Sequence, residues 1–375
     1  MAKLNEKRSI FLVSAFVAVA LLAAQVKPAM AATVYTTQME TCVRGIVEKP
    51  EKRIDLPGLV RLLFHDAFVR GLDGSVLLTS TPFNTTDFAT KANLTEPTEQ
   101  GSPSNGGLRG LGMIDEIREA LEVLNVTASC ADAVAFAARE ATYVLSKTKI
   151  KYAIDGPGRL DGVVSMADEP GSNLPGPSFT YAQLLGNFTA KKFTATDLVA
   201  LSGAHCIGDT HLLPFADRLN VALAVPPPGP NEINATYQGV IIREEAQSPG
   251  DMTRSFKNNI RDMGSTAVAE SRYTPNKVDM TAPVDTLDNS FYNANLQNMV
   301  RFKSDWELRT NSFARGLMVT YRDNPDTFYA AFKAAMTKLS NNLPAVGTRF
   351  ERGSRKICSA TNFDTQESYP AKNKP

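Results

Sequence analysis

Two of the three histidines in this chain belong to apolar runs that lie far apart in the sequence. His65 lies within the run RLLFHDAF, residues 61–68, and His205 ends the run LVALSGAH, residues 198–205. The third histidine is His211. Because histidine is so scarce, these two runs constrain the fold and the chemistry of the chain more than any other feature.

The first run places an arginine beside its histidine. Arg61 and His65 are four residues apart, so on a helix they share one face. A neighbouring cation tends to keep an imidazole neutral. A neutral histidine can accept a proton, and an arginine can stabilise developing negative charge. Taken alone, however, the two residues fit a surface pair on a half-buried helix better than a catalytic pair.

The second run carries its histidine at the end of an apolar helix. The preceding TATD, residues 194–197, resembles a capping box and predicts where this helix begins. His205 shares a face with Leu198 and Leu201, and a lone histidine there is more often a core residue than a ligand. A haem iron, however, needs one imidazole from an apolar helix in a dry pocket, with the other ring nitrogen hydrogen-bonded.

The N-terminus has the features of a cleaved secretory signal peptide. Basic residues at positions 3, 7 and 8 precede an apolar run over residues 10–24, and Ala29-Met30-Ala31 ends it with small residues. A membrane anchor is the alternative, but the run is short for a membrane span. We therefore expect a signal peptide over residues 1–31 and no membrane segment in the mature chain.

The composition excludes several classes of protein. The sequence is 43% hydrophobic and 21% charged, which excludes a disordered or fibrous chain. Removing a signal peptide of charge +3 from a chain of +1 leaves −2, so we expect no overall attraction to nucleic acid. Five N-glycosylation sequons agree with secretion and predict surface positions, at Asn84, Asn93, Asn125, Asn187 and Asn234.

Helical periodicity dominates the mature chain, and strand signals are few and short. We expect helices over residues 108–124, 130–145, 198–205, 291–299, 311–321 and 327–339. A proline-rich stretch at 225–230 opens a segment that we expect to be an irregular insertion, over about residues 222–251. The sequence therefore predicts a single, mostly α-helical domain over residues 32–375.

Both histidine runs resemble motifs of the class III plant peroxidases, a family of secreted haem enzymes. Residues 61–68 resemble the distal-haem motif of that family, and residues 198–205 resemble its proximal-haem motif. Segments 108–110, 129–132, 291–292 and 304–308 also match, in the same order. The resemblance covers about residues 34–362. It implies the all-α haem-peroxidase fold, with about ten or more helices in distal and proximal halves around haem b, and minimal short β structure.

The resemblance assigns roles to four residues at the haem. His205 would be the axial iron ligand, and Asp305 would accept a hydrogen bond from its other ring nitrogen. His65 would carry a proton from the near oxygen of hydrogen peroxide to the far oxygen. Arg61 would stabilise charge as the O–O bond breaks.

Three further positions follow from the same resemblance. Phe64 would pack beside the haem. The family places an asparagine against the distal histidine; simple alignment puts Ser104 there, but we expect Asn105, one residue on, to reach His65. Pro157 is our candidate for the substrate channel, although its segment carries one residue more than the family pattern.

The loop after the distal motif resembles the distal calcium site of the family. Hard oxygen ligands on a glycine-bent loop suit calcium. The implied ligands are the side chains and carbonyl groups of Asp66, Val69, Gly71, Asp73 and Ser75.

A second, proximal calcium would take Asp279, Thr281 and Asp288 as ligands. Against this site, Cys206 stands where the family has a threonine ligand. The spacing between the two aspartates also differs from the family pattern by one residue. Both departures count against a proximal calcium, whereas all five ligands of the distal calcium are present.

Two of the four cysteines match a family disulfide. The resemblance pairs Cys130 with Cys358, and their long loop would contribute roughly 5 kcal/mol at most. Ala67 and Leu72 stand where the family has another disulfide. Cys42 lacks its family partner, so we expect it to be unpaired or to pair in a way that the family does not show.

Taken together, the sequence predicts a monomeric, secreted haem peroxidase that uses hydrogen peroxide to oxidise phenolic or similar small reductants by one-electron steps. The apoplast or cell wall is the expected location, with the vacuole as a second option. The alternative is a peroxidase-fold protein that binds haem or a wall component with little turnover, which the lost disulfides motivate. Retention of Arg61, His65, His205 and Asp305 argues against this alternative. No GxSxG or HExxH motif supports a hydrolase.

Overall fold

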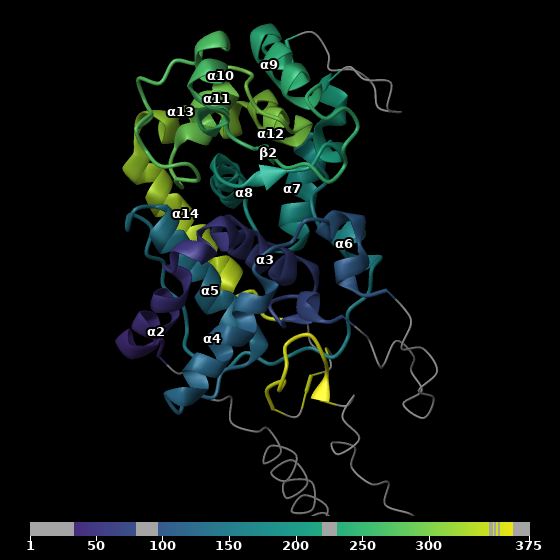
Figure 1. Ribbon diagram of the computed structural model, residues 1–375, viewed down its shortest axis with the longest axis vertical. Helices are drawn as coiled ribbons and strands as arrows, with labels where there is room; N and C mark the ends of the chain where they lie inside the picture. Colours follow the sequence, from purple (N-terminus) through teal and green to yellow (C-terminus); the bar gives the residue numbers. More distant parts are fainter. Residues whose placement is uncertain are drawn as a thin grey trace, which may run out of the picture.

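The computed structural model describes residues 34–79, 97–219, 231–344, 348, 350, 351 and 353–362. The expected signal peptide and the sequons at Asn84 and Asn93 lie outside the described residues. The described chain is mostly helical, as the periodicity predicted, with little strand (Figure 1). None of these helices combines the length and apolar character that a bilayer-spanning helix needs.

The helices form two groups on either side of the centre of the molecule (Figure 1). The lower group in this view carries His65, and we call it the distal half. Its helices are α2 (Thr37–Val47), α3 (Leu56–Val69), α4 (Leu111–Val123), α5 (Cys130–Leu145) and α6 (Glu169–Asn173). Helix α3, which carries His65, packs along α5 and also contacts α6, while α2 and α4 contact α5.

The upper group carries His205, and we call it the proximal half. Helix α14 starts in this group, where it contacts α8. It then runs down to the distal half and contacts α3 (Figure 1). The helices after α6 are α7 (Tyr181–Ala190), α8 (Ala195–Ser202), α9 (Ala235–Glu245), α10 (Ser265–Glu270), α11 (Ser290–Leu296), α12 (Lys303–Glu307), α13 (Ser312–Asp323) and α14 (Pro325–Ser340).

The predicted capping box at the start of α8 is present. Thr194 Oγ1 accepts a hydrogen bond from the Asp197 N–H at 3.2 Å, and Asp197 Oδ2 accepts one from the Thr194 N–H at 2.8 Å. After α8 the chain tightens into a 3₁₀ turn, η5 (Gly203–Cys206), that carries His205. A Cβ atom on Gly203 would lie 2.6 Å from the Phe328 ring, so this turn can pack closely only with glycine.

An aromatic cluster fixes α3 against the start of the proximal half. The Phe68 ring lies 4.9 Å from the ring of Phe188 and 5.5 Å from that of Phe193, measured between centroids. All three side chains are buried. Burying such a side chain stabilises the fold by about 1.5–3 kcal/mol relative to leaving it exposed. This packing therefore sets how α3 stands relative to α7 and α8, and thereby how the two histidine runs face each other.

The segment from 222 to 251 is not irregular throughout, so that part of the prediction is wrong. Residues 235–245 form α9, because Asn234 Oδ1 caps it by accepting from the N–H groups of Thr236 and Tyr237, both at 3.0 Å. Tyr237 and Ile241 bury one face of α9 in a second apolar cluster of the proximal half. The proline-rich residues that suggested an irregular segment lie outside the described residues.

One short sheet lies close to the proximal histidine in the chain. Strand β1 (Asp209–Thr210) pairs antiparallel with β2 (Phe256–Lys257), with Asp209 opposite Lys257. The Lys257 ammonium also forms an ion pair with Asp209 at 2.8 Å. This pairing joins the residues that follow His205 to the segment after α9.

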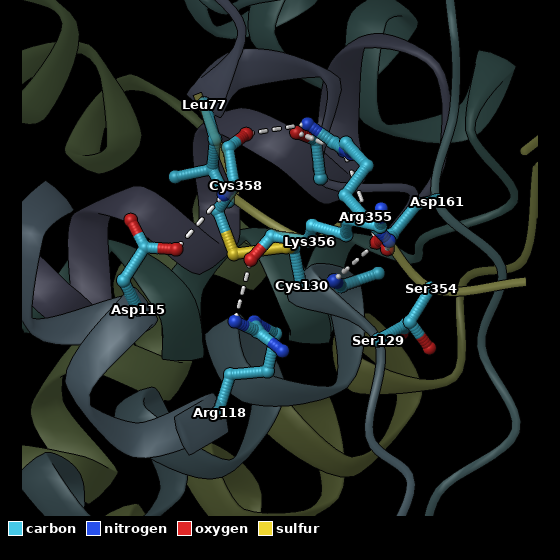
Figure 2. The surroundings of a disulfide bond; sticks show 12 residues. Leu77, Asp115, Arg118, Ser129, Cys130, Asp161, Ser354, Arg355, Lys356 and Cys358 are labelled. Carbon is cyan, nitrogen blue, oxygen red and sulfur yellow. Dashed lines mark hydrogen bonds and ion pairs between the residues drawn. A yellow bond between two sulfur atoms is a disulfide. The ribbon is translucent and has the colours of Figure 1, made fainter. Parts of the chain in front are cut away.

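The disulfide implied by the resemblance is present between Cys130, at the start of α5, and Cys358 (Figure 2). The Cys358 N–H donates to Asp115 Oδ1 at 2.8 Å, and Arg118 donates to the Lys356 carbonyl at 2.6 Å. Figure 2 shows both contacts next to the bridge, each made by a side chain of α4. The C-terminal segment is therefore tied to both α4 and α5.

Three glycosylation sequons lie within the described residues. Asn125 is exposed, whereas Asn187 and Asn234 are half-buried. The Asn187 amide donates to the Asn173 carbonyl at 2.7 Å, and the Asn234 side chain caps α9. Of these three side chains, Asn125 fits the expected surface position best.

Candidate active site

Helix α3 presents Arg61 and His65 on one face, as their spacing predicted. His65 Nδ1 lies 2.6 Å from Asn105 Oδ1, and Arg61 Nε donates to His65 Nε2 at 3.1 Å. An amide oxygen can only accept a hydrogen bond, so Nδ1 carries the proton and Nε2 is the acceptor. The imidazole is therefore neutral, with its basic nitrogen on the side of Arg61.

Asn105, and not Ser104, supplies the side chain that contacts His65. It ends the 3₁₀ turn η4 (Pro103–Asn105), and its amide donates to the Glu99 carbonyl at 2.8 Å. Ser104 offers only its carbonyl oxygen, which accepts from Arg61 Nη2 at 3.1 Å. One turn thus holds both the histidine and the arginine in place.

The charges around this pair keep His65 unprotonated. Burial lowers the pKa of His65 to about 3, and the Arg61 charge adds to the effect. Burial, with Arg109 nearby, lowers the pKa of Arg61 to about 10, which still leaves it charged at neutral pH. The distal pair therefore combines a proton acceptor with a fixed positive charge.

His205 has the opposite surroundings. Its Nδ1 lies 2.8 Å from Asp305 Oδ1 and 3.0 Å from Oδ2, and Asp305 is buried in α12. Burial lowers the pKa of His205, but the Asp305 carboxylate outweighs burial, so the pKa is raised overall. Because Nδ1 is taken by the carboxylate, Nε2 is the nitrogen that can bind a metal.

Aromatic rings enclose the proximal histidine. The His205 ring meets Phe302 edge-on at 5.1 Å and Phe291 at 6.2 Å, measured between centroids. A small cavity beside them is lined by these three side chains together with Asn258 and Arg301. Sequence reasoning noted Phe291 only as part of a motif and missed Phe302, although Phe302 lies three residues before Asp305.

The two halves of the site face a common interior. The Arg61 charge on α3 also lowers the pKa of His205, against the larger effect of Asp305. Phe64 stacks on Phe68 at 4.5 Å and lies 6.2 Å from the His65 ring. An open imidazole nitrogen, a carboxylate behind it and aromatic walls fit a haem bound through His205.

The loop after α3 contains buried oxygen atoms that lack partners. Asp66, Asp73 and Ser75 are all buried, and so is Glu99. Asp73 Oδ2, Ser75 Oγ and both Glu99 carboxylate oxygens have no hydrogen-bond partner among the described residues. Buried acidic oxygens without partners are costly, so this group of side chains fits a hard cation such as calcium.

The raised pKa values of the same carboxyl groups also fit a cation site. Burial, with Asp73 nearby, raises the pKa of Asp66 to about 8, and burial raises that of Asp73 to about 6. Burial and these two neighbours also raise the pKa of Glu99. Glu99 was missed because nothing in the local sequence shows that it folds back onto the loop.

The two carbonyl ligands expected from the resemblance lie in the bend of this loop. The Val69 carbonyl accepts a hydrogen bond from Lys191 Nζ at 2.9 Å, which leaves it a second lone pair. Gly71 has a φ of +92°, and a Cβ there would lie 2.6 Å from the Pro344 backbone. The loop conformation therefore depends on glycine at this position.

Hydrogen bonds from Asn342 join the two positions where the family has a disulfide. The Asn342 amide donates to the Ala67 carbonyl at 2.7 Å, and the Asn342 carbonyl accepts from the Leu72 N–H at 2.8 Å. Ala67 and Leu72 are both fully buried. A single residue from the chain after α14 thus spans the loop without a covalent bond.

The residues expected to bind a proximal calcium are engaged separately. Asp279 is exposed, where it accepts from the Thr281 N–H and hydroxyl and lies 3.4 Å from Lys147 Nζ. Asp288 is buried and pairs with Arg261 at 2.5 Å. Asp279 and Asp288 therefore differ in burial and have separate partners.

Pro157 lies in the segment that packs on the first turn of α5. The N–H groups of the next two residues, Gly158 and Arg159, donate to the Asp132 carboxylate at 3.0 and 3.1 Å. A role for Pro157 in the substrate channel stays a prediction. Cys42 and Cys206 are free, as expected for Cys42.

Comparison with known proteins places the chain in a family. The family model described as peroxidase matches residues 39–324. Peroxidase 2 of Zea mays is 33% identical over 87% of this chain and 86% of its own length. Peroxidase 22.3 of Oryza sativa is 32% identical over 81% of each chain, and peroxidase 5 of Vitis vinifera is 46% identical over 44% of this chain and 46% of its own. This chain therefore belongs to the peroxidase family, among the class III plant peroxidases.

Proposed function

We propose that this chain is a secreted haem peroxidase that uses hydrogen peroxide to oxidise phenolic or similar small reductants by one-electron steps. The observation that carries the proposal is the contrast between the two histidines. His65 is neutral and hydrogen-bonded to Arg61 and Asn105, whereas His205 is held by Asp305. One imidazole is thus suited to proton transfer and the other to metal binding.

On the distal side, His65 would act as the proton carrier. Its Nε2 atom accepts a hydrogen bond from Arg61 and would exchange that donor for an O–H group of hydrogen peroxide. The proton would then pass to the far oxygen, which leaves as water. The Arg61 guanidinium, fixed by the carbonyl groups of Ser104 and Gly106, would stabilise the negative charge that develops on that oxygen.

On the proximal side, Asp305 would act through His205. Its carboxylate accepts the Nδ1–H group, which fixes the tautomer and makes Nε2 a more basic ligand. The Asn295 amide donates to the Asp305 carbonyl at 2.7 Å and holds this residue in position. A haem bound through His205 would supply the redox-active iron.

We propose one calcium ion in the distal loop, held by the expected ligands Asp66, Val69, Gly71, Asp73 and Ser75. The unpartnered Glu99 carboxylate adds negative charge beside that set. Glu99 also links the loop to the distal histidine, because its carbonyl holds the Asn105 amide. Calcium would therefore stabilise both the end of α3 and the turn that orients His65.

Secretion is supported by two independent features. The N-terminal sequence has the order of a signal peptide, and the chain forms a disulfide, which is typical of oxidising compartments. The apoplast or cell wall is therefore the proposed location.

Rapid mixing of the haem-loaded protein with hydrogen peroxide tests the proposed chemistry. We expect a fast change in the haem absorption spectrum of the wild type and a rate about 100- to 10,000-fold lower for His65→Ala. His211→Ala is the matched control, because His211 instead faces the Arg254 carbonyl at 3.1 Å. An unchanged rate in His65→Ala would overturn the role of His65. A wild type that binds haem but ignores peroxide would favour a binding protein with little turnover.

A further inference from the structure

A buried arginine lies where the resemblance places the proximal calcium. Arg261 belongs to the 3₁₀ turn η7 (Ile260–Met263), and 1% of its side chain is exposed. Its guanidinium meets Asp288, one of the three expected calcium ligands. Arg261 therefore already supplies a positive charge to Asp288, the carboxylate that calcium would need as a ligand.

All five N–H groups of the Arg261 guanidinium side chain are used. The Nε–H donates to Asp262 Oδ1 at 2.9 Å, and Nη1 donates to Asp288 Oδ2 at 2.5 Å and to Ser290 Oγ at 3.1 Å. Nη2 donates to Asp262 Oδ2 at 3.2 Å and to the Thr286 carbonyl at 3.0 Å. This fork-shaped pairing with two carboxylates is the geometry in which a buried arginine is most stable.

The remaining candidate ligands already have partners within the chain. Asp288 Oδ1 accepts from the Ser290 N–H at 2.9 Å, and Asp279 is exposed and bound to Thr281. The residue after His205 is Cys206, whose free thiol is buried. Calcium needs six to eight oxygen ligands around one point, and sulfur is a poor ligand for it.

The same network reaches the backbone that follows the proximal histidine. Asp262 Oδ2 also accepts from the Asp285 N–H at 3.0 Å, and Asp285 Oδ1 accepts from the Gly208 N–H at 2.8 Å. Arg261 therefore connects to the backbone at Gly208 through one of its carboxylate partners, Asp262.

We propose that the Arg261 guanidinium takes the place of the proximal calcium of the family, so that the proximal half holds a permanent cation and binds no second calcium ion. Arg261 is then a positioning residue for the backbone after His205. It cannot be removed by a chelator, whereas a metal ion can. This proposal concerns metal binding and stability, and it does not depend on turnover.

Calcium stoichiometry tests the proposal directly. Full-length wild type and Asp73→Asn are equilibrated with calcium, and the bound metal is measured by atomic emission. We expect one calcium per wild-type chain and none in Asp73→Asn. A calcium ion that remains bound to Asp73→Asn would overturn the role of Arg261. A wild type that binds no calcium would contradict the distal site proposed above, but would still support an arginine in place of the proximal ion.

Thermal unfolding of Arg261→Gln provides the second measurement. Two buried carboxylates would lose their cation, so we expect the Tm to fall by about 5 °C or more. Arg243→Gln is the matched control, because Arg243 is exposed and pairs with Glu270 at the surface. Arg261→Lys keeps the charge without the fork and should lie between the wild type and Arg261→Gln. Equal Tm values for Arg261→Gln and Arg243→Gln would contradict the proposal, and if Arg261→Gln fails to fold, the stoichiometry of Asp73→Asn decides.

Discussion

The distal and proximal halves give the same side chain opposite surroundings. His65 is buried beside an arginine and an amide, which lowers its pKa and leaves a basic nitrogen. His205 is paired with a buried carboxylate, which raises the pKa of the imidazole and occupies Nδ1 with a hydrogen bond. The two side chains are chemically identical, so the role of each imidazole follows from its neighbours.

Buried carboxylates also have different partners in the two halves. In the distal loop, Asp73 and Glu99 keep oxygen atoms without partners, which leaves negative charge for an added cation. In the proximal half, Asp262 and Asp288 are paired with Arg261. A cation supplied by the chain makes one half independent of metal, while the other half responds to calcium supply.

The strongest test of the comparison exchanges one histidine at a time for alanine. His205→Ala should lower haem affinity by at least about 100-fold, because loss of the ligand exceeds the effect of losing its hydrogen-bond partner. His65→Ala should bind haem as the wild type does. The measurement is the haem absorbance that remains after desalting. Equal retention of haem by the two variants would remove the distinction between ligand and proton carrier.

Calcium removal should destabilise the protein by an amount that depends on pH. In the calcium-free chain the pKa values of Asp66 and Asp73 are raised to about 8 and about 6, above the ordinary value of about 4. Between about pH 4 and pH 8 the folded chain then binds more protons than the unfolded chain, so its free energy of unfolding falls as pH rises.

Bound calcium replaces those protons and should remove that slope. At a calcium concentration about 1,000 times Kd, the gain is about 4 kcal/mol. Urea unfolding with calcium and with a chelator, at pH 5 and pH 8, measures both effects. The comparison would fail if the chelator had the same effect at both pH values, or if it had no effect at all.

Asp305→Asn should have a smaller effect than loss of His205 itself. The amide can still contact Nδ1, but it carries no charge to increase the basicity of the ring. We expect a 10- to 100-fold loss of haem affinity or of peroxide reactivity. Asp326→Asn, at the exposed start of α14, is the control and should match the wild type in both measurements. A wild-type value for Asp305→Asn would show that charge behind His205 is unimportant.

Much of the fold could be predicted because local patterns determine it. Helix α5 begins and ends at the expected residues 130 and 145, and α8 begins at its predicted capping box. The family motifs also pointed to the disulfide and to both histidines. Helix α9 was missed because the prolines before it suggested an irregular segment throughout.

The undetected parts of the site depend on tertiary contacts. Glu99 and Phe302 reach the site from other segments, and neither lies in a motif that reveals its role. Arg261 looks like a surface residue in the sequence, because only the fold brings Asp262 and Asp288 around it. Asn105, by contrast, was expected from the sequence to reach His65, and the 3₁₀ turn places its side chain there.

The smallest expected effect concerns the hydrogen bonds that replace a family disulfide in the distal loop. Asn342→Ala removes the donor to the carbonyl of Ala67, a buried residue in the last turn of α3, so we expect a loss of about 1–2 kcal/mol in the free energy of unfolding. Asn324→Ala is the matched control in the proximal half, because its amide donates to the Thr320 carbonyl at an exposed helix end.

Urea unfolding of both variants should be compared with calcium and without it. If calcium and Asn342 hold the same loop, the Asn342→Ala variant should lose part of the stabilisation that calcium gives the wild type, whereas Asn324→Ala should keep all of it. Contacts that share one structural element are not additive, and such coupling is typically 0.5–3 kcal/mol, which is about the size of the single effect itself. Strict additivity of Asn342→Ala and calcium removal would show that the hydrogen bonds and the ion stabilise separate parts of the distal half.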